Sequence, residues 1–165
     1  EASLVLFVGD RFQWGLREVS FGFAYIGLII VLSQGFLVRK LLPKLGEKKM
    51  LAAGLVMMIL GFGMITFSYS IAVLAVAMTL VAFGNSFSNP STLGSISLLS
   101  SGEEQGAVLG ATQGTASLGR IIGPALGGFL YGIGVSPFLL ASVMVVVGLV
   151  MVVLKFRLLP DSAKH

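Results

Sequence analysis

The sequence contains no cysteine, and its only histidine is the final residue, His165. Without thiols, disulfide scaffolds, thiolate metal sites, cysteine nucleophiles and thiol redox chemistry are excluded. Charge is also scarce: 11% of the 165 residues are charged, whereas a soluble globular domain carries about a quarter. Because so little polar surface is available, we expect lipid to be the solvent for most of this chain.

Long apolar runs occupy most of the sequence, which is 56% hydrophobic. A transmembrane helix needs roughly 20 mostly apolar residues to cross a hydrocarbon core about 30 Å thick. Five runs meet that requirement and predict an all-α, polytopic membrane helix bundle. The predicted spans are residues 19–38, 50–68, 71–100, 107–132 and 137–154.

The N-terminal segment offers only seven apolar residues, Ala2 to Val8, before Gly9, Asp10 and Arg11. That is too short for a crossing, and the segment lacks the basic start and cleavage site of a signal peptide. We therefore expect it to be the end of a sixth helix. Residues 1–165 then form one six-helix membrane domain with a truncated first helix, cut from a larger protein.

The basic residues cluster in two segments. The connector at residues 39–49, RKLLPKLGEKK, holds five basic residues and one acid, and the tail adds Lys155, Arg157 and Lys164. Four predicted spans separate the two segments, so both lie on one side, which the positive-inside rule assigns to the cytoplasm. The net charge of +4 is thus explained by membrane orientation, and nucleic acid is not expected as a partner.

Glycine is abundant, at 22 residues, and is densest in the fourth complete span. Small residues let membrane helices approach closely, so this span is predicted to pack tightly against its neighbours. Pro124 should bend it, either as part of a conformational change or as a purely structural kink. The residues of this packing and gating seam are Gly110, Gly114, Gly119, Gly123, Pro124, Gly127 and Gly128.

Polar side chains form two stripes inside the predicted spans. Gln113, Ser117 and Arg120 share one helical face, as do Asn85 and Asn89 on the preceding span. Gln34 is a lone amide late in the first complete span. These six residues either line a wet substrate cavity or make hydrogen bonds between packed helices.

Arg120 is the most informative residue, because a guanidinium inside a span costs several kcal/mol unless it is paired or hydrated. Every acid of the chain falls in a predicted loop or terminus. The counter-charge is therefore an anionic substrate, a carboxylate on another part of the protein, or carbonyls and cavity water. If the span begins later, Arg120 could instead extend to the interface.

The same residues argue against an enzyme. The predicted spans contain no paired aspartates, no serine with a histidine base and no set of metal ligands. No metal site and no cofactor is expected. Proton coupling needs a titrating side chain, and arginine effectively never releases its proton, so a proton-carrying carboxylate would have to come from outside these residues.

Three stretches carry a resemblance to a known family, and one of them is the N-terminal LFVGDRFQWGLREVSFGFAYIG, residues 6–27, which is similar to the end of that family's seventh helix, the outer loop and the eighth helix. The sequence EEQGAVLGATQGTASLGRIIGPALGGFLYG, residues 103–132, resembles the tenth loop and eleventh helix of major facilitator superfamily transporters. The branch it is most similar to is bacterial drug efflux, including tetracycline:proton antiporters. The glycines and proline at residues 119–128 look like the second-half copy of that family's antiporter motif.

The connector is similar to the second-half copy of the family's loop between its second and third helices. The matching positions are Lys44, Gly46, Lys48 and Lys49, whereas Arg39 and Pro43 depart from the pattern. The resemblance implies the C-terminal half of a twelve-helix fold, with substrate bound near the midplane between two halves. It further implies proton-coupled efflux of small organic molecules by alternating access in a bacterial inner membrane, with a cytoplasmic C-terminus.

The implied partners are the bilayer, an N-terminal six-helix half, a small-molecule substrate and protons as coupling ion. The alternative is a truncated or degenerate membrane protein that does not transport and acts as a structural or interaction partner. A channel fits less well, because no filter-like loop lies between the spans.

Overall fold

The computed structural model describes residues 2–155, and every regular element in that range is helical. The basic tail residues Arg157 and Lys164, with His165, lie outside the described residues. The elements are α1 (Ala2–Phe12), α2 (Leu16–Leu32), the π-helix η1 (Ser33–Val38), α3 (Arg39–Thr66), α4 (Ile71–Leu99), α5 (Gln105–Gly132) and α6 (Pro137–Lys155).

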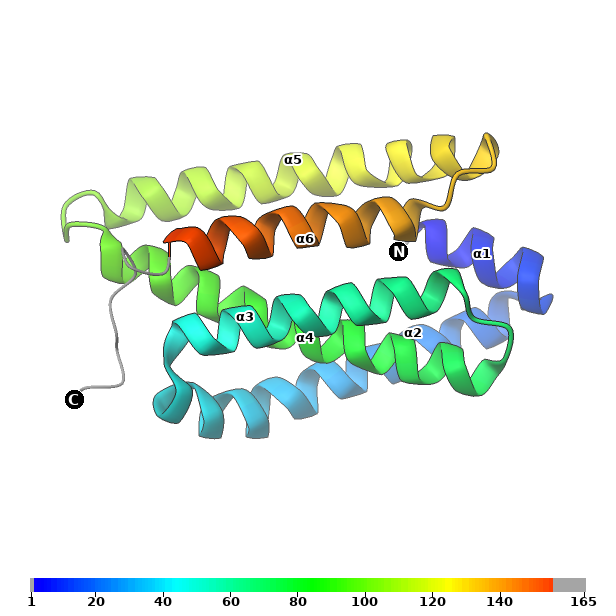
Figure 1. Cartoon of the computed structure of the whole chain (residues 1–165), viewed down its shortest axis with the longest axis horizontal. Coiled ribbons are helices and arrows are strands. Elements are labelled where there is room, and N and C mark those ends of the chain that lie inside the picture. Colours follow the sequence, from blue (N-terminus) through cyan, green and yellow to red (C-terminus); the bar gives the residue numbers. More distant parts are fainter. Residues whose placement is uncertain (1, 156–165) are drawn as a thin grey trace.

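The helices run along the long axis of the bundle and reverse direction at each turn (Figure 1). The α1–α2, α3–α4 and α5–α6 connections lie at one end, which we call the outer end. The α4–α5 connection, the bend within α3 and the last turn of α6 lie at the other, which we call the basic end. Lys44, Lys48, Lys49 and Lys155 thus belong to a single end, as the charge distribution predicted.

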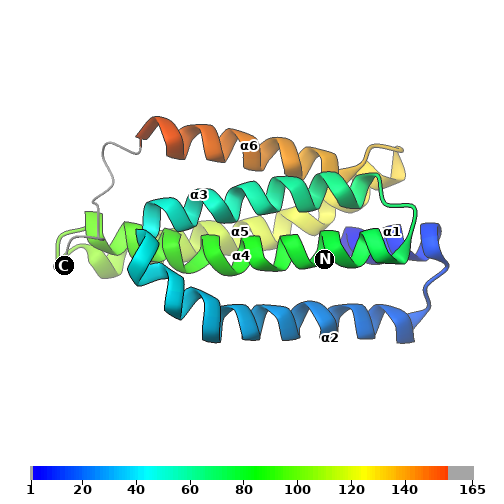
Figure 2. The same ribbon diagram turned by 60° about the horizontal axis from the view of Figure 1, so that its bottom comes forward.

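The centre of the bundle is a row of four helices. In Figure 2, α6, α3, α4 and α2 follow one another in that order, and the contacts between the neighbouring pairs agree with it. The contact between α3 and α4 is the most extensive in the described chain. α5 lies at the side of this row. Its contacts with neighbouring helices are much smaller than those that α3 makes with α4 and α6.

In the described part of the chain, three helical stretches are long and apolar enough to cross a membrane: Leu16–Thr66, Ile71–Leu99 and Pro137–Lys155. The first contains 51 residues and is broken at Gly46, so it has room for two crossings. α5 has 28 residues, but its many glycines and hydroxyl side chains lower its hydropathy. The chain is an integral membrane protein, and the number of five complete spans stays a prediction.

The basic connector is helical, whereas the sequence predicted a loop. Helix α3 begins at Arg39 and continues to a single break at Gly46, where φ is 74° and ψ is 164°. The connector folds as helix because Leu41 and Leu42 pack against the buried cluster of Val38, Met50 and Phe87. At Gly46 the chain reverses through a backbone conformation that essentially only glycine adopts.

Glycines also permit the close contact between α3 and α4. A Cβ on Gly54 would lie 2.8 Å from the carbonyl oxygen of Gly84, and a Cβ on Gly61 would lie 2.9 Å from that of Ala77. Backbones at this separation gain dispersion contacts that larger side chains would prevent. The sequence predicted close glycine packing on α5 and not at this interface between α3 and α4.

The glycines of α5 are mostly open in the described chain. No neighbouring atom lies within 4 Å of a Cβ built on Gly110, Gly114, Gly119, Gly123 or Gly128. Gly127 is the exception, because the Ser3 side chain of α1 occupies that space. Tight packing along the rest of this face would need protein outside residues 2–155, so it stays a prediction. α5 is one continuous helix through Pro124.

Candidate substrate pathway

The polar stripe of α5 is exposed along its whole length. Gln113, Ser117 and Arg120 are all solvent-accessible, and no hydrogen bond joins them to another residue within 2–155. Their spacing of four and three residues places them on one face of α5. In a bilayer, such side chains require water or a polar partner, which the described part of the chain does not supply.

Arg120 lies near the middle of α5. By the helical rise of 1.5 Å per residue, its backbone is roughly 20 Å from either end of the helix. Its side chain is exposed and makes no described contact with backbone carbonyls. The guanidinium is therefore neither at a helix end nor enclosed in a dry helix junction.

The described acids are all distant from the centre of a helix. Asp10 lies in the last turn of α1 and Glu18 in the first turn of α2. Glu47 follows the break at Gly46, while Glu103 and Glu104 precede α5. Among residues 2–155, no carboxylate is thus available to Arg120 at the same depth.

The second polar stripe lies on α4. Gly84 and Ser88 face α3, whereas Asn85 and Asn89 are exposed on another side of the helix and form no hydrogen bond within the described range. Thr92, one turn further on, donates to the Ser88 carbonyl at 2.7 Å and is satisfied within its own helix. Asn85 and Asn89 are therefore the polar groups that α4 leaves available.

Gln34 lies in the π-helix η1, a feature that the sequence did not reveal. Its side chain is exposed, while the preceding Ser33 is fully buried. π-Helical turns are rare and frequently occur at functional sites. The π-helix η1 thus carries Gln34 as an exposed side chain between the end of α2 and the basic connector.

The structure keeps the two stripes on separate helices. A hydrogen bond from Gln105 Nε2 to Ser97 Oγ joins α5 to α4 near their connection at the basic end. α5 also contacts α1 and α6. Both polar faces are therefore open within this chain.

Residues 2–165 match the Major Facilitator Superfamily. The chain belongs to this superfamily. Its members are membrane transporters and not enzymes. No solved structure matches the chain.

The superfamily members most informative here are drug-resistance proteins. Multidrug resistance protein 2 of Bacillus subtilis (strain 168) is 33% identical over 152 residues, covering 90% of this chain and 37% of the relative. The class B tetracycline resistance protein of Escherichia coli is 28% identical over 127 residues, covering 77% and 31%. The class C protein of the same organism is 26% identical, covering 80% and 33%. This superfamily chain spans about a third of the length of these relatives.

Proposed function

We propose that this chain is the C-terminal helical half of a secondary transporter that exports small organic molecules in exchange for protons by alternating access. The names of its relatives, a multidrug resistance protein and two tetracycline resistance proteins, support drug-like substrates. The partial coverage of those relatives agrees with a further half outside this chain.

The observation that carries this proposal is the exposed Arg120 near the middle of α5. A permanent cation at that depth, without a carboxylate or carbonyl partner in residues 2–155, requires water or an external anionic or polar group. Gln113 and Ser117 on the same face add hydrogen-bonding capacity. Such a face is suited to a wet pathway and unsuited to contact with lipid tails.

Arg120 would attract the electronegative atoms of a substrate, and the amides of Asn85, Asn89 and Gln34 would offer both donors and acceptors. Because arginine does not titrate in proteins, the proton would be carried by a carboxylate outside this chain. The part played by Arg120 would be electrostatic attraction and orientation of the substrate.

The open glycine face of α5 would pack against the missing helices. Its small residues and Pro124 would let α5 shift relative to them between the two states of the transporter. The connector residues Lys44, Gly46, Lys48 and Lys49 would lie on the cytoplasmic side of a bacterial inner membrane, together with the C-terminus.

The test is an efflux assay on the full-length protein that contains this chain, expressed in cells loaded with tetracycline or ethidium. We expect Arg120→Ala to lower the initial efflux rate at least tenfold and Gln113→Ala to lower it severalfold, with Arg120→Lys intermediate. Leu118→Ala, at an exposed position on the same helix, is the matched control. A protonophore should abolish wild-type efflux.

Unchanged rates and substrate range in both Arg120→Ala and Gln113→Ala would remove these residues from the pathway. Wild-type protein that reaches the membrane but gives no efflux above the empty vector would favour the non-transporting alternative.

A further inference from the structure

The π-helix η1 inserts one extra residue between α2 and the basic connector. Val19, Ile26 and Ser33 follow one another at intervals of seven residues, so they share the face of α2 that packs toward the core. In a continuous α-helix, the next residue on this face would be Leu37, four positions after Ser33. The structure instead buries Val38, five positions after Ser33, through the wider turn of η1.

One apolar slot therefore lies within reach of two consecutive side chains. Val38 fills the slot, which Met50 of α3 and Phe87 of α4 form. It is 7% exposed there, whereas the neighbouring Leu37 is 39% exposed. Both are branched aliphatic side chains, and buried positions tolerate exchanges between such residues. The extra residue of η1 decides which of the two the slot holds.

The segment after η1 is short and ends at a break in the helix. Residues 39–45 form the helical connector, and at Gly46 the backbone leaves the helix with φ 74° and ψ 164°. Placing Leu37 in the slot would advance this segment by one residue, which is a turn of about 100° and a shift of about 1.5 Å. Leu41 would then take the place of Leu42 against the buried cluster. The break at Gly46 would absorb the displacement.

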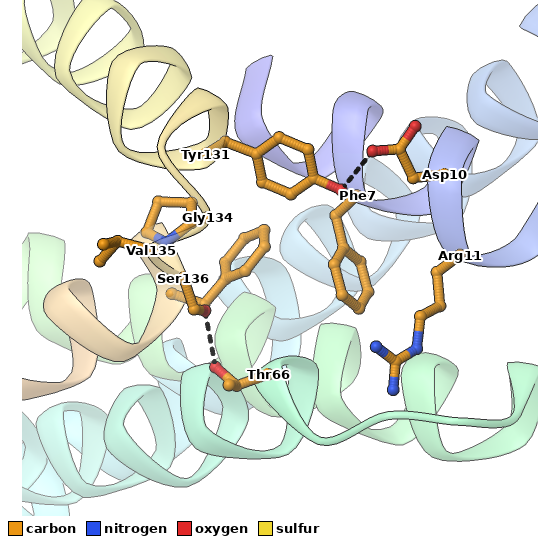
Figure 3. A pocket seen from close by; sticks show the side chains of 10 residues that line it. Phe7, Asp10, Arg11, Thr66, Tyr131, Gly134, Val135 and Ser136 are labelled. Carbon is orange, nitrogen blue, oxygen red and sulfur yellow. Dashed lines mark hydrogen bonds between the residues drawn. The ribbon is translucent and has the colours of Figure 1, made fainter.

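The outer end of the bundle is held by side-chain hydrogen bonds instead. The Tyr131 hydroxyl donates to Asp10 Oδ2 at 2.7 Å, which joins α5 to α1. Ser136 Oγ and Thr66 Oγ1 are hydrogen-bonded at 3.3 Å and join α6 to α3. All four residues line a cavity of about 430 Å³ (Figure 3). No side chain of η1 makes a hydrogen bond to another residue within 2–155, so no such bond opposes a one-residue displacement there.

We propose that η1 is a register switch. In the observed state the π turn places Val38 in the slot, whereas in a second state residues 33–38 are α-helical and Leu37 occupies it. Val38 then moves to the exposed position that Arg39 has now. The conversion turns the basic connector and reorients Lys44 at the basic end, while α2 keeps its packing. A movement of α4 against α3 during transport would reshape the slot and select the register, a step that rests on the proposed function.

Alkylation of a buried cysteine tests the switch without requiring transport. The full-length protein, freed of any other cysteine, carries Val38→Cys in membrane vesicles and is treated with N-ethylmaleimide. The thiol is shielded in the observed register and exposed when Leu37 takes the slot. Ser68→Cys is the control reporter, because Ser68 is fully buried in the α3–α4 turn, where Arg11 stacks on Tyr69 with 4.0 Å between Cζ and the ring centroid. We expect Val38→Cys to react at least tenfold faster than Ser68→Cys.

Leu37→Gln is the decisive variant, because an amide is disfavoured in the apolar slot and tolerated at the exposed position of Leu37. In the Val38→Cys background it should lower the alkylation rate at least fivefold. Val31→Gln, at a 67% exposed position of α2, is the matched control and should leave the rate unchanged. Deletion of Gly35 removes the extra residue, so a continuous α-helix places Val38 in the slot. Alkylation should then fall to the level of Ser68→Cys.

A Val38→Cys rate equal to that of Ser68→Cys, or one that Leu37→Gln leaves unchanged, would overturn the proposal. If Leu37→Gln does not fold, the deletion of Gly35 decides in the same way. Full efflux in Arg120→Ala would refute the proposed pathway and leave these alkylation rates as they are, so the two failures are distinguishable.

Discussion

Gly54 and Gly84 meet backbone to backbone where α3 crosses α4: a Cβ on Gly54 would lie 2.8 Å from the Gly84 carbonyl oxygen and one on Gly84 would lie 2.7 Å from the Gly54 carbonyl oxygen. Backbone atoms cannot rotate away as the end of a flexible side chain can. We therefore expect Gly54→Ala to force α3 and α4 apart and to cost about 1–3 kcal/mol. Thermal unfolding in detergent would measure the loss.

Gly63→Ala is the control for this substitution, because a Cβ there meets nothing within 4 Å. It lies on the same helix and should slightly raise stability through better helix propensity. Equal melting temperatures for Gly54→Ala and Gly63→Ala would contradict the close packing of α3 on α4.

The reversal at Gly46 depends on a positive φ of 74° combined with an extended ψ of 164°. An alanine in this region is strained by about 1–3 kcal/mol, so Gly46→Ala should destabilise the connector. Limited trypsin digestion at Lys44, Lys48 and Lys49 would detect the change as faster cleavage. Gly35→Ala in η1, which has open space around it, should leave the digestion rate unchanged.

Ser86 and Ser68 are both fully buried, but their hydroxyls have different surroundings. Ser86 Oγ has no hydrogen-bond partner among residues 2–155, whereas Ser68 Oγ donates to the Ile65 carbonyl at 2.9 Å. Removing an unsatisfied hydroxyl relieves a desolvation cost, while removing a bonded one loses about 0.5–1.5 kcal/mol. Ser86→Ala should therefore be neutral or stabilising and Ser68→Ala destabilising. Chemical or thermal unfolding of the two variants measures the difference, and a loss of stability in Ser86→Ala as large as that in Ser68→Ala would contradict an unsatisfied Ser86 hydroxyl.

The hydrogen bond from Tyr131 to Asp10 joins the outer ends of α5 and α1. Because the pair is exposed, its loss in Tyr131→Phe should cost only about 0.5–1 kcal/mol. Hydrogen exchange of the α1 amides would report a faster local opening. Tyr69→Phe keeps the ring beneath Arg11 and should leave α1 exchange unaffected, which separates the hydrogen bond from the stacking contact.

The sequence by itself predicted the class of the protein. The scarcity of charge and the length of the apolar runs predicted a helical membrane protein, and the glycine-rich residues 103–132 indicated the superfamily that the comparison then showed. Arg120 could be singled out because a permanent cation in a long apolar stretch has few physical explanations. These inferences need only local composition and spacing, so tertiary contacts do not alter them.

Tertiary structure decided which small residues make contact and which charges come together. Glycines repeat every four residues on α5 and are sparser on α3, yet within residues 2–155 it is Gly54 and Gly61 of α3 that approach the backbone of a neighbouring helix. The helical connector depended on Leu41 and Leu42 finding a buried cluster. Asp10 and Tyr131 are 121 positions apart, and only the folding of α1 against the end of α5 brings them within hydrogen-bonding distance. Periodicity defines a helix face, whereas the partner of that face depends on how the whole chain packs.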